Sequence, residues 1–124
     1  MENFILEPTE KTLKINFNAQ KGTFEMEGSS YSENTWQFFQ SLNVWLRRYI
    51  AEVGNPITMN LKINYLNSTS TKYLMDFLLI LEEFYENGGK VKVNWYYEEG
   101  DDIQEMGEDF AADLNLPLDL IVYD

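Results

Sequence analysis

The feature of this chain that most constrains its fold is a change of hydrophobic period near residue 67. Over residues 57–65 apolar and polar side chains alternate, which predicts a strand that buries one face, with Tyr65 as the last residue of that face. Over residues 74–85 apolar side chains recur every three or four positions, which predicts an amphipathic helix. The fold must therefore contain a strand that leads almost directly into a helix.

Alternation predicts further strands on both sides of this unit. Residues 13–26 read as a hairpin that residues 28–30 close, and residues 4–6 add a short edge strand. Residues 91–97 alternate as well, and residues 118–122 are compatible with a last short strand.

Helical spacing predicts two more helices. The first begins after Asn34, a plausible N-cap, and ends before Gly54, while the last covers residues 103–114. The element order is then β-β-β-α-β-α-β-α. Three large side chains in the middle of the apolar stripes are predicted to be core residues: Trp45, Leu81 and Phe110.

The strands indicate how the layers are arranged. Strands buried on both faces read as continuous apolar runs, whereas these alternate, with Asn60, Lys62 and Asn94 on a shared polar face. The sequence therefore predicts one α/β (α+β) domain over residues 1–124, with a mixed, open sheet and helices packed mainly on one face.

Composition excludes many kinds of catalytic site. The chain has no histidine and no cysteine, so thiol nucleophiles, Cys-ligated zinc and the usual serine triad are absent. The acidic residues 98–102 do not have the spacing of an EF-hand loop, and acids before a helix are common because they suit the helix dipole. We predict no catalytic residue, no metal and no cofactor.

Charge indicates the kind of partner. The net charge is −12, and no lysine or arginine follows Lys92. Such a surface repels nucleic acids and anionic membranes and attracts basic proteins. The chain also lacks an apolar run long enough to span a membrane and a signal-peptide pattern, so we expect a cytoplasmic protein without membrane insertion.

Four consecutive hydroxyl residues, 68–71, occupy the change from strand to helix. Serine and threonine are favoured N-caps, so capping alone is one interpretation. The other is a phosphorylated hydroxyl, because the free N–H groups at a helix start suit an anion.

Short motifs along the chain resemble the SiaC family of bacterial regulatory phosphoproteins. The resemblance extends over residues 6–118 and rests on these segments, in this order: 28–33, 38–39, 45–46, 65–70, 95–97 and 107–110. It implies a fold like the STAS domains of anti-sigma-factor antagonists. It also implies a switch in which a protein kinase phosphorylates one hydroxyl of the turn and a PP2C-type phosphatase removes the phosphate. The unphosphorylated form is then expected to bind and activate a diguanylate cyclase.

The resemblance assigns roles to individual residues. The modified threonine of the family corresponds to Ser68, with Thr69 and Ser70 as alternative acceptors. A phosphate on Ser68 is then expected at the strand end, before the cap, with the N–H groups of Thr69, Ser70 and Thr71 as donors. The expected partner-binding residues are Asn67, Ser68, Thr69, Ser70, Lys72, Tyr31 and Glu33. Ser32 and Ser41 stand where prolines are expected in the family, and Ser32 is expected to loosen the loop before the first helix. Two other functions remain open: a constitutive acidic adaptor without phosphorylation, and an enzyme that uses carboxylates.

Overall fold

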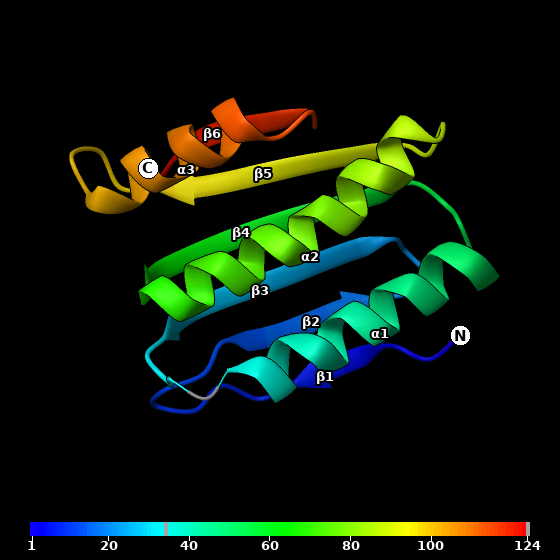
Figure 1. The fold of residues 1–124 in the computed structure, drawn as a ribbon, viewed down its shortest axis with the longest axis horizontal. Coiled ribbons are helices and arrows are strands. Elements are labelled where there is room, and N and C mark those ends of the chain that lie inside the picture. The colour runs from blue at the N-terminus through cyan, green and yellow to red at the C-terminus, as the bar shows by residue number, and fades with distance from the viewer. Residues whose placement is uncertain (34, 124) are drawn as a thin grey trace.

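The computed structural model describes residues 1–33 and 35–123, which form six strands and three helices (Figure 1). In chain order the elements are β1 (Phe4–Leu6), β2 (Lys14–Asn18), β3 (Thr23–Ser30), α1 (Trp36–Glu52), β4 (Ile57–Leu66), α2 (Ser68–Glu86), β5 (Val91–Tyr97), α3 (Asp102–Asp113) and β6 (Leu118–Val122). This order matches the prediction and adds β6 as a true strand. The proposed cap at position 34 lies outside the described residues.

All six strands belong to one sheet in the order β1-β2-β3-β4-β5-β6. The pairs β1/β2 and β2/β3 are antiparallel, whereas β3, β4, β5 and β6 run parallel to one another. Each helix connects two of the parallel strands, and all three cover the same face of the sheet (Figure 1). The predicted mixed, open sheet with helices on one side is confirmed. Because each helix follows a parallel strand, the three helix N-termini lie at one edge of the molecule.

The other face of the sheet is polar and uncovered, as predicted. Asn60, Lys62 and Asn94 are partly exposed there. Asn94 donates a hydrogen bond from Nδ2 to Oδ1 of Asn60 at 2.9 Å, and Lys62 Nζ lies 3.8 Å from a carboxylate oxygen of Glu25. Cross-strand pairs of this kind stabilise a sheet modestly and hold its polar face together.

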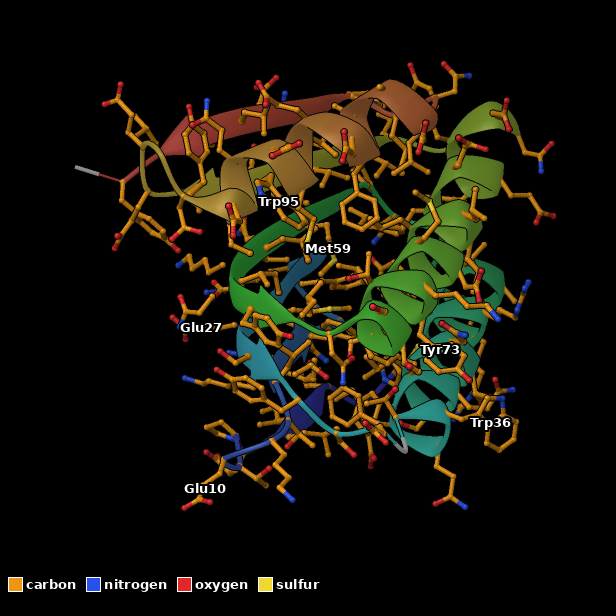
Figure 2. All side chains as sticks on the ribbon, turned by 60° about the vertical axis from the view of Figure 1, so that its left-hand side comes forward. Glu10, Glu27, Trp36, Met59, Tyr73 and Trp95 are labelled. Carbon is orange, nitrogen blue, oxygen red and sulfur yellow. The ribbon has the colours of Figure 1, made fainter. Side chains whose placement is uncertain are left out.

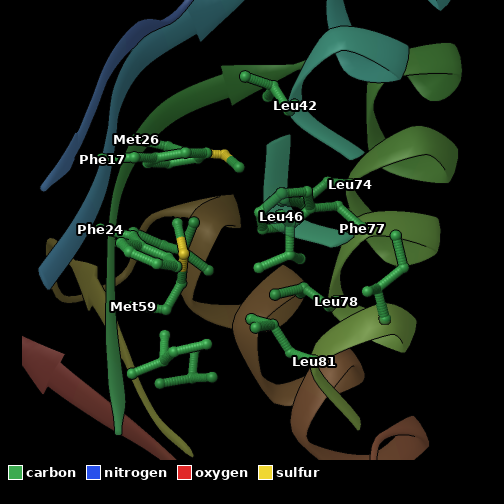
Figure 3. Close-up of a cluster of buried hydrophobic side chains, with 14 of the residues drawn as sticks. Phe17, Phe24, Met26, Leu42, Leu46, Met59, Leu74, Phe77, Leu78 and Leu81 are labelled. Atoms are coloured by element: carbon green, nitrogen blue, oxygen red, sulfur yellow. The ribbon is translucent and has the colours of Figure 1, made fainter. Parts of the chain in front are cut away.

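The core lies between the sheet and the helices, where apolar side chains from both layers interdigitate (Figure 3). Leu81 and Phe110 are buried in it, as predicted. Trp45 lies at its margin and packs its ring on Phe17 and Phe24, with centroid distances of 5.4 and 5.2 Å. In Figure 2, Met59 points from the sheet into this layer.

Two predictions about the strands were wrong. β3 continues to Ser30 instead of ending in a turn at residues 28–30. The register between β3 and β4 shifts after Gly28, which leaves Asn64 as an extra residue on β4. Such a bulge reverses the direction of the side chains that follow it. Tyr65, predicted to be buried, is therefore 44% exposed, and Leu66 is buried in its place.

Candidate functional site

The candidate site lies where β3 and β4 end and α2 begins. Asn67 has an extended backbone, with φ −73° and ψ 173°, and its Oδ1 accepts a hydrogen bond from the Ser70 N–H at 2.8 Å. This is the geometry of an N-cap, since it satisfies an N–H that has no partner within the helix. The prediction that Ser68 precedes the cap was wrong. Asn67 is the cap, and Ser68 is the first residue of the helix.

Asn67 also fixes the loop that follows β3. Its Nδ2 donates to the carbonyls of Tyr31 at 3.0 Å and Ser32 at 3.1 Å, and its backbone N–H donates to the Ser30 carbonyl at 3.1 Å. Ser32 is the residue that was expected to loosen this loop. Its carbonyl accepts one of these hydrogen bonds from Asn67. One asparagine side chain therefore sets both the start of α2 and the position of the neighbouring loop.

The four hydroxyl residues of the turn have different environments. Ser70 is buried, and its hydroxyl lies 2.6 Å from that of Ser30. The Thr71 hydroxyl donates to the Asn67 carbonyl at 2.9 Å. Thr69 is half-buried, and Ser68 is exposed. Two of the four hydroxyls therefore hold the start of the helix in place, and Ser68 is the one displayed to solvent.

The backbone donors at this helix start differ from those expected. The Ser70 and Thr71 N–H groups already donate to Oδ1 and to the carbonyl oxygen of Asn67. The N–H groups of Ser68 and Thr69 have no partner among the residues that the structure describes. An anion on Ser68 would meet these two donors and the positive end of the helix dipole. Lys72, one turn further along α2, is also exposed.

Two exposed tyrosines flank the site. The rings of Tyr31 and Tyr65 stack with a centroid distance of 4.8 Å and an interplanar angle of 20°, although they are 53% and 44% exposed. The structure thus brings Tyr31 next to Asn67, and Glu33 is exposed in the same loop. Tyr65 was not predicted as a site residue. The available signal was Gly28, because a glycine inside a strand often marks a bulge.

Among the acidic residues 98–102, Asp101 has a clear structural role. Oδ1 of Asp101 accepts a hydrogen bond from the Ile103 N–H at 3.0 Å and so caps α3. Within the described part of the chain, no group of three or more acidic side chains is arranged to hold a metal ion. None of the three described helices is long and apolar enough to cross a membrane.

Comparison with known families identifies the chain's relatives. Residues 6–123 match the family model described as SiaC family regulatory phosphoprotein. The chain belongs to the SiaC family. An uncharacterised protein of Pseudomonas aeruginosa strain UCBPP-PA14 is 31% identical over 125 residues, which cover 100% of this chain and 99% of that protein. The family resemblance of the short motifs is thereby confirmed.

Solved structures of family members have the same fold. Apo-SiaC from Pseudomonas aeruginosa matches with a TM-score of 0.92 at 31% identity, over 98% of this chain and 99% of that one. A second structure holds the diguanylate cyclase SiaD in complex with its activator SiaC, also from Pseudomonas aeruginosa. It matches with a TM-score of 0.91 at 30% identity, over 97% and 99% of the two chains. The family is regulatory, and this relative acts on a cyclase.

Proposed function

We propose that this chain is a non-catalytic signalling phosphoprotein that binds and activates a diguanylate cyclase, and that phosphorylation of Ser68 abolishes this binding. A protein kinase adds the phosphate and a PP2C-type phosphatase removes it. The observation that carries the proposal is the exposed Ser68 hydroxyl on the first turn of α2, in a member of a regulatory phosphoprotein family. Because the kinase requires ATP, the switch operates in the cytoplasm.

Exposure favours Ser68 over the alternative acceptors. A kinase must reach the hydroxyl that it modifies, and the Ser70 hydroxyl is buried against Ser30. Thr69 is half-buried. Phosphorylation of Ser70 would break a buried hydrogen bond, whereas phosphorylation of Ser68 breaks none that the structure records.

A phosphate on Ser68 is compatible with the fold. It adds about −1.5 to −2 charge and three acceptor oxygens. The free N–H groups of Ser68 and Thr69 can donate to these oxygens, and Lys72 is exposed one helical turn away. The modification therefore changes the surface of the protein without unfolding α2.

The same phosphate is unfavourable inside an interface. The surface around Ser68 includes the exposed Tyr31 and Tyr65 rings, which are side chains of the kind that anchor protein interfaces. A partner that covers this surface would desolvate the phosphate, which costs several kcal/mol when no cation pairs with it. Since about 1.4 kcal/mol is tenfold in affinity, this cost suffices to separate the complex.

Phosphorylation of the purified protein tests the acceptor. We expect incubation with ATP and the kinase of the same organism to add one phosphate, and peptide mapping to place it on Ser68. Ser68→Ala should abolish the modification, whereas Thr69→Ala should retain it. A phosphate that maps to Thr69 would move the switch by one residue, and a turn that stays unmodified would overturn the proposal.

A further inference from the structure

We propose that the groove between α2 and α3 binds a basic amphipathic helix of a partner protein. This groove, here called the α2–α3 groove, has a volume of about 390 Å³ and is lined by side chains from both helices. The groove begins beside the first turn of α2, since Thr71 and Lys72 line its near end, and it extends away from Ser68 along both helices. The proposal itself does not require phosphorylation.

The two sides of α2 face different neighbours. Tyr73 stacks on Phe39 of α1 with a centroid distance of 6.0 Å, which identifies the side of α2 that packs on α1 (Figure 2). Lys72 and Met75 lie on the side toward α3 and line the groove. The helix layer is therefore packed between α1 and α2 but open between α2 and α3.

The floor of the groove is apolar. Met75 comes from α2, and Met106 and Phe110 come from α3. Both methionines are half-buried, so part of each side chain faces the groove. Methionine is flexible and polarisable, and methionine-rich grooves accept the apolar face of an amphipathic helix without a unique shape.

The α3 rim of the groove is a continuous row of acids. Asp102, Glu105, Asp109 and Asp113 follow one another at spacings of three or four residues, so they form one stripe about 16 Å long. None of the four forms an ion pair within residues 1–33 and 35–123. Lysines or arginines along the flank of a docked helix would match this spacing.

The position of these acids argues against a purely local role. Asp102 lies in the first turn of α3, where the helix dipole favours a negative charge. Asp113 is the last residue of the helix, and Asp109 is one turn before it, where the dipole disfavours negative charge. Because Asp109 and Asp113 do not stabilise their own helix, a cationic partner is the better explanation for them.

A designed peptide provides a direct test. The probe is a helical peptide of about five turns with leucines on one face and lysines beside them. A control peptide has the same composition with the leucines spread around the helix. We expect the amphipathic peptide to bind and to shift the NMR methyl signals of Met75 and Met106. The control should bind at least roughly tenfold more weakly, because it cannot fill the apolar floor.

Matched protein variants distinguish specific binding in the groove from nonspecific attraction of a basic peptide to an acidic protein. Asp109→Asn combined with Asp113→Asn should weaken peptide binding by roughly tenfold. Glu7→Gln combined with Glu10→Gln removes the same charge from an exposed segment and should leave the affinity nearly unchanged. Equal effects of the two double variants, equal affinity for the two peptides, or methyl shifts outside the groove would overturn the proposal. A dimer of the protein alone in light scattering, with Met75 and Met106 methyl signals that shift as the protein concentration rises, would also overturn it, since the occupant would then be a second copy.

Discussion

The hydroxyls of Ser30 and Ser70 lie 2.6 Å apart in the core and join the end of β3 to the first turn of α2. Ser68 lies on the exposed side of the same turn. The residue that we propose as the switch therefore lies on a turn that this buried hydroxyl pair holds to β3 and that Asn67 caps.

Ser70→Ala tests the contribution of the hydroxyl pair to stability. The substitution leaves the buried Ser30 hydroxyl without a partner, which should lower the free energy of unfolding by about 1–3 kcal/mol. Ser30→Ala should have a similar effect. The double variant should lose less than the sum of the two, because it leaves neither hydroxyl unpaired. Urea denaturation of the three variants measures this difference, and strictly additive losses would show that the two hydroxyls do not interact.

Substitutions of Asn67 separate its two roles. Asn67→Ala removes the cap and should cost about 1–2 kcal/mol, and the loss of the hydrogen bonds to the Tyr31 and Ser32 carbonyls adds to this. Asn67→Asp keeps an acceptor for the Ser70 N–H but cannot donate to the loop, so it should recover only part of the loss. Thermal unfolding gives the order of stability. An Asp variant as stable as the natural protein would show that the bonds to the loop contribute nothing.

The layers of this fold could be predicted from the sequence because the hydrophobic periods are regular. The alternation at residues 57–63 and 91–95 set which faces are buried, and the open polar face followed from it. The bulge at Asn64 could not be predicted in this way, since it depends on how β4 pairs with β3. For this reason the alternation placed Tyr65 on the wrong face of the sheet.

The candidate site was predictable in composition but not in its arrangement. The run of hydroxyl residues marked the position, yet sequence alone did not distinguish the buried Ser70 from the exposed Ser68. That distinction comes from the partner of Ser70, which lies 40 residues earlier in the chain. The α2–α3 groove also depends on the distance between two helices, which no local pattern encodes.

Tyr49→Phe tests a buried phenol in the core. Tyr49 is fully buried, and its hydroxyl has no hydrogen-bond partner among the described residues. An unpaired buried hydroxyl is unfavourable, so the phenylalanine variant should be as stable as the natural protein or more stable by about 1 kcal/mol. Urea denaturation at neutral pH measures this. A loss of more than about 1 kcal/mol would indicate that the hydroxyl has a partner in solution.

The same residue should affect stability at high pH. Burial raises the pKa of Tyr49 above its ordinary value of 10.0. The unfolded chain loses the Tyr49 proton near its ordinary pKa, whereas the folded chain keeps this proton to a higher pH. The free energy of unfolding therefore falls as the pH rises above about 10. Tyr49→Phe should reduce this fall, because the variant has no phenol to titrate at this position. Identical pH profiles for the natural protein and Tyr49→Phe would contradict the assignment.

The affinity of the protein for the diguanylate cyclase that we propose as its partner, measured with and without phosphate on Ser68, tests the central claim most directly. Isothermal titration calorimetry would compare the unmodified protein, the Ser68-phosphorylated protein and Ser68→Ala treated with the same kinase. We expect the unmodified protein and Ser68→Ala to bind equally well and the phosphorylated protein to bind at least roughly tenfold more weakly. Ser68→Asp should lie between them, because a carboxylate has less charge and fewer oxygens than a phosphate. Equal affinities of the phosphorylated and unmodified proteins would contradict the account.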